Sequence, residues 1–399
     1  MRCILTVNFS PWSRYSGGSQ RSTHNLARAL ARRGHAVQVV YTKPPWEQVP
    51  LPDALPYEVI WAALPALRSE SDALLQPITP WFVAHQVERL LRRTGPAVVH
   101  GNGEEAALLP ELRTHRKTPR FGFVMTPRYP ALPPVFESGQ AHRSGALRAL
   151  FSVTHTKYVL LGRALAGADF ICPTSRFASE LVQRAYALDS QKLRVIPNGV
   201  SEEFLKASPG RDAHDSPAQV PFAIYFGRLA REKGVHTLLD ALADAGPEPE
   251  TFVFAGRGPE LERMRQRARA LGLAHRVRFM TWLDPKALAD LVRKASFAVL
   301  PSLEESFGNT MAEAMALAVP VISTTAGSIP ELIENNRTGV LVPPGSAQAL
   351  SMAIRSLAND PARRKGLALA AQAKVRAEYS WDAVAARFEG VYAAALEAR

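Results

Sequence analysis

Cysteine is scarce in this chain of 399 residues, which holds only Cys3 and Cys172. Both lie in apolar runs typical of strands, and two cysteines in so long a chain form no disulfide framework, so we expect a reducing compartment. Long apolar runs are also missing. Polar or charged residues interrupt every apolar segment before about 18 residues, and the N-terminal apolar run is too short for a signal peptide. The sequence therefore predicts a cytoplasmic protein.

Patterns that mark several classes of functional site are absent as well. The chain has no Asp-x-Asp, and no two of its ten histidines lie within four residues of each other. We therefore expect no dedicated metal site and no bound cofactor. The G-x-S-x-G turn of serine hydrolases is missing. Without zinc-ligand spacing, a basic helix or an aromatic-basic RNA motif, nucleic acid is not an expected partner.

The composition is that of a globular protein with more than one domain. Apolar residues make up 47% of the chain and charged residues 21%, close to the globular average. A single core seldom grows beyond about 250 to 300 residues, so we expect two domains. The net charge is +12; residues 1–200 carry 24 basic against 13 acidic side chains, whereas residues 201–399 carry 24 against 23. The first half should attract anions, such as an acidic substrate or an anionic membrane surface.

Apolar runs alternate with helical patterns along the whole chain, which predicts doubly wound α/β domains with parallel sheets. The predicted strands of the first half are CILTVNF, HAVQVVY, AVVHG (97–101), RFGFVMT (120–126), ADFICPTS (168–175) and LRVIPNG (193–199). Those of the second half are FAIYFGRL, TFVFAGRG, VRFMTW, FAVLPS, VPVIST and GVLVPP. Segment 206–221 has the composition of an interdomain linker, and the Pro-rich stretches 42–80 and 129–145 are predicted to be irregular.

Two glycine turns suit either a ligand or a structural role. Gly17 and Gly18 precede a predicted helix whose N-terminal amides could bind an anion, but a Gly-Gly turn by itself is more often a simple turn and cap. The stretch AGRGPELER begins like a dinucleotide fingerprint at Gly256 and Gly258, yet Leu261 stands where the third glycine belongs. A tight strand-to-helix turn explains this stretch better than NAD binding.

A pair of cations follows the first predicted strand of the second half. In FGRLAREKG, Arg228 and Lys233 stand just past the carboxyl end of that strand, the edge at which open α/β sheets bind ligands. Two cations there could neutralise a leaving diphosphate, because a fixed positive pair stabilises charge that develops in a transition state. The structural alternative is a solvated loop.

Two acids surround a glycine turn in EESFGNTMAEA, residues 304–314. Glu305 lies on the loop, and Glu313 falls in the first turns of a helix predicted from about Asn309. A glycosidase pair would have to flank one bond at a set distance, which sequence cannot show. A better interpretation is that the turn amides bind phosphate while the two carboxylates accept hydrogen bonds from sugar hydroxyls. We take Glu304 as a solvated loop residue.

Together, GGSQRSTHNLARALARRGHAVQVV, VIPNGV, FGRLAREKG, AGRGPE, EESFGNTMAEAMALAVPVI and TGVLVPPG resemble the retaining, nucleotide-sugar-dependent glycosyltransferases of GT-B fold, family four. The order and spacing hold along nearly the whole chain, most clearly over 221–345. The resemblance implies two Rossmann-like domains, 1–200 and 201–379, facing each other across a cleft, with the closing helix 380–399 packed back on the first. The first would bind the acceptor and the second the nucleotide sugar.

The resemblance also implies roles for individual residues. Glu313 would hold the ribose hydroxyls, Glu305 would contact the donor sugar, and Arg228 and Lys233 would bind the diphosphate. The other implied donor contacts are Gly17, Gly18, Asn198, Gly199, Phe307, Gly308, Asn309 and Thr310, and the implied catalytic residues are Arg228, Lys233, Glu305 and Arg128. Transfer would proceed with retention and without a metal, the leaving phosphate helping to deprotonate the acceptor hydroxyl.

One position departs from the family pattern. Where many relatives carry a histidine in a Thr-x-His context, this chain has Thr126, Pro127 and Arg128. A permanent cation in place of a titrating side chain points to an acidic donor sugar, an anionic acceptor or weakened catalysis. His100 also fits the family pattern on the acceptor side, although a core histidine at a strand end is the alternative.

The expected function is therefore transfer of a sugar from a nucleoside-diphosphate sugar to an acceptor hydroxyl. The alternatives are a GT-B nucleotide-sugar epimerase and a non-catalytic nucleotide-sugar-binding module. The acceptor is not readable from the sequence; an anionic and a lipid-linked molecule are both alternatives. The basic first half predicts peripheral contact with the anionic inner face of a membrane.

Overall fold

The computed structural model describes residues 1–13, 17–44, 46–65, 78–128, 153–205, 221–246, 251–281 and 283–398. The chain divides into two compact units. Unit 1 comprises Met1–Gly199 and Trp381–Arg399, and unit 2 comprises Val200–Ser380. The loop predicted at 129–145 lies outside the described residues, as does all but the last residue of the linker predicted at 206–221.

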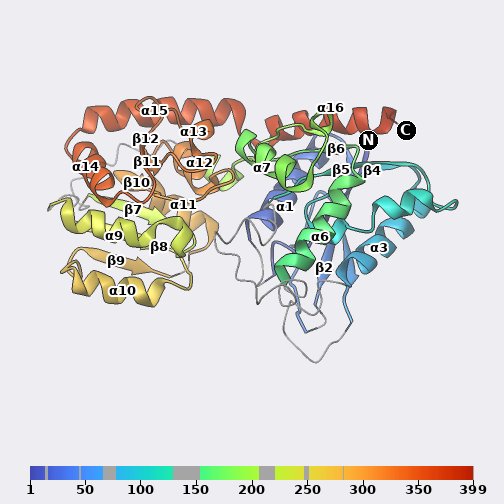
Figure 1. Ribbon diagram of the computed structural model, residues 1–399, viewed down its shortest axis with the longest axis horizontal. Helices are drawn as coiled ribbons and strands as arrows, with labels where there is room; N and C mark the ends of the chain where they lie inside the picture. Colours follow the sequence, from blue (N-terminus) through green and yellow to red (C-terminus); the bar gives the residue numbers. More distant parts are fainter. Residues whose placement is uncertain are drawn as a thin grey trace. The chain divides into compact units, whose positions relative to one another are not determined.

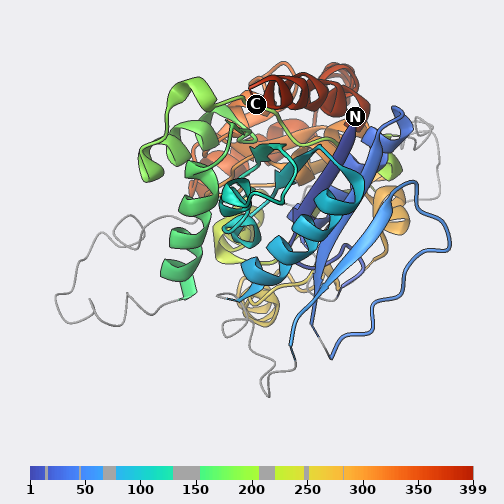
Figure 2. The same cartoon turned by 90° about the vertical axis from the view of Figure 1, so that its right-hand side faces the viewer.

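Unit 1 is built on a six-stranded sheet in the order β3-β2-β1-β4-β5-β6, with every pairing parallel. Its strands are β1 (Arg2–Val7), β2 (Ala36–Lys43), β3 (Glu58–Ala63), β4 (Ala97–Gly101), β5 (Phe121–Met125) and β6 (Phe170–Ile171). The first three strands lie next to one another in blue in Figure 2. The chain moves outward from β1 to β3 and then restarts at β4 on the other side of β1, so the strand order reverses between β1 and β4.

Helices cover both faces of this sheet. They are α1 (Gly18–Arg32), α3 (Thr79–Thr94), α6 (Val153–Ala166), α7 (Arg176–Tyr186) and α16 (Trp381–Glu397), with short 3-10 turns η1 (Glu104–Ala106), η2 (Pro110–Thr114) and η3 (Ser190–Lys192). Alternate side chains of β1 enter different cores: Ile4 packs with residues of α3 and α6, whereas Leu5 packs with residues of α1 and α16. A strand buried on both faces needs a nearly continuous apolar run, and in CILTV the one polar side chain, Thr6, has its hydroxyl bonded to Glu105.

The last helix completes unit 1 although it follows unit 2 in the chain. Trp381, Phe388 and Tyr392 of α16 are buried in the same core as β1 and α1, and Figure 1 shows α16 beside the strands of this unit. Gly199 permits this packing, because a Cβ atom there would come within 2.5 Å of the Trp381 ring. Unit 1 is therefore closed by a segment almost 200 residues downstream of Gly199.

Unit 2 repeats the architecture with the parallel order β12-β11-β10-β7-β8-β9. Its strands are β7 (Phe222–Phe226), β8 (Thr251–Ala255), β9 (Val277–Met280), β10 (Phe297–Val299), β11 (Val321–Thr324) and β12 (Val340–Val342). Its helices are α8 (Glu202–Leu205), α9 (Val235–Asp244), α10 (Leu261–Ala270), α11 (Pro285–Arg293), α12 (Asn309–Ala316), α13 (Ile329–Leu332), α14 (Ala347–Ala358) and α15 (Pro361–Glu378), with the 3-10 turn η4 (Arg231–Lys233). The strand order reverses between β7 and β10. The predicted pair of parallel α/β sheets is confirmed.

Two strand predictions in unit 1 are wrong. Strand β3 lies inside the stretch 42–80 that we expected to be irregular; EVIWAA has the β-branched and aromatic side chains of a strand, but the prolines around it obscured the signal. The predicted strand 193–199 makes only an isolated bridge, between Leu193 and Ile171. Pro197 has no amide hydrogen to donate, so a regular ladder cannot continue through this segment.

Close backbone contacts hold the loops at the carboxyl ends of the unit 2 strands. A Cβ atom at Gly256 would lie 1.9 Å from the carbonyl oxygen of Gly227, and one at Gly258 would lie 2.0 Å from that of Leu229. The two loops are also tied by a hydrogen bond of 2.7 Å from the Leu229 amide to the Arg257 carbonyl. The glycines of AGRGPE therefore allow the β8 loop to pack on the β7 loop, as expected for a tight structural turn.

None of the helices in the described segments combines the length and the apolar character that crossing a bilayer requires.

We predict that Gly256→Ala destabilises unit 2 by at least about 2 kcal/mol, because the added methyl group collides with backbone that cannot rotate away. Urea unfolding of the full chain measures the change. Gly366→Ala in α15 is the matched control, since a Cβ atom there meets nothing within 4 Å and alanine favours a helix. Equal unfolding midpoints for the two variants would contradict the close packing of these loops.

Candidate functional site

Eight of the predicted donor-binding residues belong to unit 2 and lie at or after the carboxyl ends of β7 and β10, whereas Gly17, Gly18, Asn198 and Gly199 belong to unit 1. These two strands are paired neighbours and mark the reversal of strand order. Open parallel sheets bind ligands at such a reversal, because the loops that follow the two strands lead away in opposite directions. We call this cluster of loops, residues 227–234 and 300–310, the unit 2 edge.

Lys233 and Glu305 meet in an ion pair at the unit 2 edge. Lys233 ends the turn η4, and Glu305 lies on the loop between β10 and α12. The Nζ atom of Lys233 is 2.7 Å from Oε2 of Glu305, with 25% and 14% of the two side chains exposed. The structure thus brings the predicted phosphate-binding cation and the predicted sugar-binding acid together, although 72 residues separate them.

The backbone of Glu305 is fixed by its neighbours. Its carbonyl oxygen accepts hydrogen bonds from the Ser328 amide at 3.0 Å and from the Ser328 hydroxyl at 3.2 Å. Gly327, whose φ is +55°, allows this approach, because a Cβ atom there would lie 2.2 Å from the same oxygen. The carboxylate of Glu305 is therefore presented from a rigid loop.

Arg228 takes a more exposed position on the same edge. Its guanidinium pairs with Glu232 on its own loop, and 62% of its side chain is exposed. Its carbonyl oxygen accepts a hydrogen bond of 2.7 Å from the Tyr225 hydroxyl, which fixes the backbone at this point. Arg228 therefore lies at the predicted edge but is paired within its own loop.

The N-terminus of α12 lies at this edge. Gly308 is the N-cap with a φ of +97°, and it has no side chain that could bond the first-turn amides. Thr310 lies beside the β7 loop, since its methyl carbon is 3.3 Å from a Cβ built at Gly227. The helix dipole gives such a terminus a positive potential that suits an anion.

The remaining predicted residues of EESFGNTMAEA differ in burial. Glu313 is half-buried one helical turn after Asn309, so both lie on the same side of α12. Phe307 is 5% exposed and packs against Tyr379, with ring centroids 5.8 Å apart, so a ligand could reach only its backbone. Glu304 is exposed, as expected of a solvated loop residue.

In unit 1, Arg128 follows β5 and is met by residues of the segments that follow β4 and the turn η3. Its Nε donates to Oδ1 of Asn102 at 3.1 Å, and its Nη1 donates to Oδ1 of Asn198. The amide of Asn102 is oriented by a bond of 2.9 Å from its Nδ2 to the carbonyl oxygen of Thr6. Burial lowers the pKa of Arg128 to about 10, so the side chain remains charged at neutral pH. We call Asn102, Arg128 and Asn198 the unit 1 cluster.

His100 lies in the core beneath this cluster. It is fully buried, its Nδ1 is 2.6 Å from the Tyr392 hydroxyl, and its Nε2 is 2.8 Å from the Thr126 hydroxyl. Burial, reinforced by the charge of Arg128, lowers its pKa to about 3. With both ring nitrogens engaged and the ring neutral, the structure favours the core-histidine alternative over a direct acceptor contact.

Gly17 is the N-cap of α1 and Gly18 is its first residue, and both are exposed. The Gly17 amide donates to Oε1 of Gln20 at 2.9 Å, and Nε2 of Gln20 donates to the Asn8 carbonyl at 2.6 Å. The Gln20 side chain thus caps the helix and ties it to the end of β1. This geometry fits the turn-and-cap alternative, with the Gly17 amide already bonded.

Two residues were not predicted from the sequence: Asn102 of the unit 1 cluster, and Glu260, which lies 3.4 Å from Arg231 beside the unit 2 edge. Asn102 gave no signal beyond its place after a predicted strand. Glu260 ends the GRGPE stretch, and its carboxylate accepts bonds from His236 at 2.7 Å and from Arg263 at 2.9 Å. Glu260 therefore ties α9 to the start of α10. The sequence signal that could have identified it is its place as the acid at the end of a glycine-rich loop.

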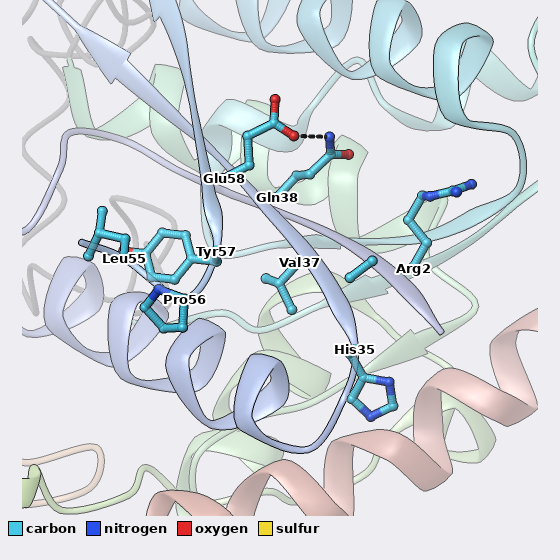
Figure 3. Close-up of a pocket in the computed structure, with 9 residues that line it drawn as sticks. Arg2, His35, Val37, Gln38, Leu55, Pro56, Tyr57 and Glu58 are labelled. Atoms are coloured by element: carbon cyan, nitrogen blue, oxygen red, sulfur yellow. Dashed lines mark hydrogen bonds between the residues drawn. The ribbon is translucent and has the colours of Figure 1, made fainter. Parts of the chain in front are cut away.

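The pocket drawn in Figure 3 lies elsewhere. It has a volume of about 330 Å³ and is lined by Arg2, His35, Ala36, Val37, Gln38, Leu55, Pro56, Tyr57 and Glu58. These residues surround the amino ends of β1, β2 and β3, and Glu58 is bonded to Gln38 across it. Ligands of doubly wound sheets bind at the opposite, carboxyl ends, so we do not place the site in this pocket.

Comparison with known proteins identifies the family. Residues 209–374 match the family model "Glycosyl transferases group 1", and residues 16–204 match "Glycosyltransferase Family 4". The 2-deoxystreptamine N-acetyl-D-glucosaminyltransferase of Streptomyces fradiae is 30% identical over 387 residues, which cover 92% of this chain and 89% of that protein. The chain belongs to family 4 of the glycosyltransferases.

Other relatives align over shorter regions. The D-inositol 3-phosphate glycosyltransferase of Streptomyces avermitilis is 33% identical over 252 residues, 59% of this chain and 53% of that protein. The glycogen synthase of Mycobacterium tuberculosis is 30% identical over 230 residues, 57% of this chain and 55% of that protein. The chain thus spans about half the length of these two relatives.

Solved structures confirm the GT-B fold of this family 4 member. Sucrose-phosphate synthase from Thermosynechococcus elongatus superposes with a TM-score of 0.79 at 25% identity, covering all of both chains. A glycosyltransferase from Rickettsia africae gives a TM-score of 0.71 at 19% identity, covering 100% of this chain and 99% of that one. An Anabaena protein solved with UDP-glucose gives 0.69 at 20% identity, covering 99% and 100%.

Across the described residues, no group of three or more His, Cys, Asp or Glu side chains is placed to hold a metal ion. Of the acids near the two edges, Glu232 and Glu305 are bonded to cations, and Glu105 is bonded to an amide and a hydroxyl.

A buried acid beside the unit 1 cluster should make stability depend on pH. Glu105 is 1% exposed, and its Oε1 accepts bonds from the Thr6 hydroxyl and the Asn102 amide, each at 3.1 Å. Burial, with the neighbouring charge of Glu104, raises its pKa from 4.5 to about 8. The folded chain therefore holds a proton that the unfolded chain releases above about pH 4.5, so the contribution of Glu105 to stability falls as pH rises to about 8.

We predict that Glu105→Gln, which stays neutral, gains stability relative to the wild type as pH rises from 5 to 8. Urea midpoints of both chains measured across this range test the prediction, because the difference cancels every other titrating group. Glu111→Gln, a change at an exposed carboxylate, should leave the difference flat. A wild type that gains stability over the variant across the range would show that Glu105 is ionised in the folded chain.

Proposed function

We propose that this chain transfers a sugar from a nucleoside-diphosphate sugar to an acceptor hydroxyl, with retention and without a metal. The observation that carries the proposal is the ion pair of Lys233 and Glu305 at the reversal of the unit 2 sheet, next to the N-terminus of α12. Cations and an uncapped helix N-terminus suit a diphosphate, and carboxylates suit hydroxyl groups. Family membership supports the same activity.

The ion pair suggests how the unit 2 edge handles charge. Without a donor, Glu305 neutralises Lys233 and keeps the ammonium in place. A diphosphate brings a stronger negative charge, so Lys233 can turn to its oxygens and release Glu305 to accept hydrogen bonds from the sugar. Charge that develops on the leaving phosphate is then met by a cation that needs no reorganisation of the loop.

Glu313 and the helix amides complete the proposed donor site. The amides of Asn309 and Thr310 begin α12 and would bind phosphate oxygens. Glu313, one turn further along, would accept hydrogen bonds from the ribose hydroxyls. Arg228 would leave Glu232 to join the diphosphate, which its exposure permits.

The donor is to be identified with a thermal-shift panel of UDP, GDP, ADP and TDP, their sugar conjugates and NAD, with and without EDTA. A ligand that binds only the folded chain raises the melting temperature. We expect a shift with one nucleoside diphosphate that persists in EDTA; UDP is the natural first choice, since a neighbour in fold was solved with UDP-glucose. A shift with NAD alone, or with none of them, would contradict the proposal.

The role of Lys233 predicts that Lys233→Ala weakens binding of that nucleoside diphosphate by about tenfold or more, because a charge-assisted hydrogen bond is lost. Glu313→Ala should weaken nucleoside diphosphate binding as well, whereas Glu305→Gln should affect the sugar conjugate more than the diphosphate. Calorimetric titration measures each affinity. Lys365→Ala, at an exposed position of α15, is the control. Unchanged affinity in the Lys233 and Glu313 variants would refute the site.

The two alternative functions, an epimerase and a non-catalytic binding module, differ from a transferase in their reaction products. An epimerase would alter the donor sugar with no acceptor present, and a binding module would leave the donor intact under all conditions. Product analysis with and without acceptor fractions separates both from a transferase. The paired charges at the unit 2 edge, Lys233 with Glu305 and Arg228 with Glu232, favour the transferase over the binding module.

We also propose that unit 1 contacts an anionic membrane through α3. Trp81 is 59% exposed and stacks on His85 with ring centroids 5.9 Å apart. Arg89 and Arg92 continue the same side of the helix and are exposed. An exposed aromatic ring followed by basic side chains suits the interface of an anionic bilayer.

Sedimentation with phosphatidylglycerol vesicles at low salt tests this contact. The wild type should sediment with these vesicles but not with phosphatidylcholine vesicles, and Arg89→Glu should reduce the bound fraction severalfold. Arg376→Glu, an equal change of charge on unit 2, should not. Wild-type chain that stays in the supernatant at low salt would rule the contact out.

A further inference from the structure

Arg128 is a largely buried cation for which the described residues supply no acid. Among the described residues, its guanidinium bonds only neutral amide oxygens, those of Asn102 and Asn198. Its third nitrogen, Nη2, is buried and has no hydrogen-bond partner in the described part of the chain. A buried polar hydrogen without an acceptor destabilises the fold, and so does a buried charge without a partner.

Another arginine of the same unit shows the contrast. Arg113 is also largely buried, but its Nη2 pairs with the carboxylate of Asp169, and its Nη1 donates to the Gly167 carbonyl at 2.9 Å. In unit 2, Arg276 and Arg364 end on backbone carbonyl oxygens. Where an arginine serves structure alone, this chain thus compensates its terminal nitrogens with carboxylate or carbonyl oxygens.

The surroundings hold Arg128 in one orientation. Asn102 follows β4 and is fixed by its bond to the Thr6 carbonyl. Asn198 is 6% exposed and precedes Gly199, which packs on Trp381. The cation is therefore fixed at the carboxyl end of β5, on the edge where sheets of this order bind ligands. A rigid cation with an unsatisfied donor is preorganised for an anion.

We propose that Arg128 binds an anionic group of the acceptor, a phosphate monoester or a carboxylate. The inference rests on the proposed function, which gives the acceptor to unit 1. An oxygen of the anion accepts the hydrogen bond that Nη2 lacks, and the negative charge neutralises the guanidinium. The same cation disfavours an acceptor with an amine nearby, because like charges repel. The donor diphosphate has its own cation, Lys233, on unit 2.

Matched sugars test the preference. Glucose, glucose 6-phosphate, glucuronic acid and glucosamine differ in charge and share a ring, and calorimetry on the full chain, saturated with its nucleoside diphosphate, measures their affinities. We expect glucose 6-phosphate or glucuronic acid to bind at least about tenfold more tightly than glucose, and the stronger of the two identifies the anion. Arg128→Gln should abolish the preference, and Arg128→Lys should retain part of it. Arg116→Gln, at an exposed arginine of the same unit, should retain all of it.

A second measurement requires neither the sugar affinities of the variants nor a bound donor. In a chain labelled with ¹⁵N-arginine, the Nε signal of Arg128 is assigned by its loss in Arg128→Lys. Titration with inorganic phosphate or with acetate should shift that signal saturably, whereas sodium chloride at equal ionic strength should not. Because it needs no nucleotide, the titration can succeed even if every nucleoside diphosphate fails to bind, so failure of the proposed function and failure of this inference are distinguishable.

Three results would overturn the inference. The first is an Arg128 signal that phosphate and acetate leave in place. The second is equal affinity for glucose and for the two anionic sugars in the wild type. The third is an Arg128→Gln chain that loses affinity for the nucleoside diphosphate alone, which would give Arg128 to the donor.

Discussion

Parallel pairing is the constraint on which both units depend. A strand that pairs in parallel with its neighbour must be joined to it by a crossover, so all strands of a sheet end at the same edge. Loops far apart in the sequence therefore meet there: Lys233 bonds Glu305 across 72 residues, and Arg128 bonds Asn198 across 70. The reversal of strand order next to β1 and next to β7 then opens each edge to a ligand.

The two edges handle charge differently. At the unit 2 edge Lys233 and Glu305 neutralise each other. A ligand that carries both a negative charge and hydroxyl groups could bind the two side chains in place of this pair. In the unit 1 cluster a cation is held by neutral amides, and the nearby Glu105 is uncharged at neutral pH because it is buried. The first arrangement suits exchange of partners, and the second suits recognition of an anion. This difference fits a division of labour between donor and acceptor binding.

Packing beneath the edges keeps these side chains in position. In unit 2, glycines let backbone touch backbone, as at Gly256 on Gly227 and at Gly327 on Glu305. In unit 1, the closing helix α16 supplies the Tyr392 hydroxyl to His100, which in turn contacts Thr126 two residues before Arg128. Helix α16, which follows unit 2 in the chain, therefore helps to hold Arg128 in position.

Much of this protein could be predicted from the sequence, because local signals determine it. Alternating apolar runs and amphipathic stretches gave the two parallel sheets, and the order of the motifs gave the family. Strand β3 was not predicted because the prolines around it outweighed its short β-branched run. Segment 193–199 was predicted as a strand because its apolar pattern was weighed above Pro197, which has no amide hydrogen to donate. Only the tertiary structure decided that Lys233 pairs with Glu305, that His100 is a satisfied core residue, and that Arg128 has amides but no described acid around it. Hydrogen bonds, burial and ion pairs join residues that are distant along the chain, so no local pattern encodes them.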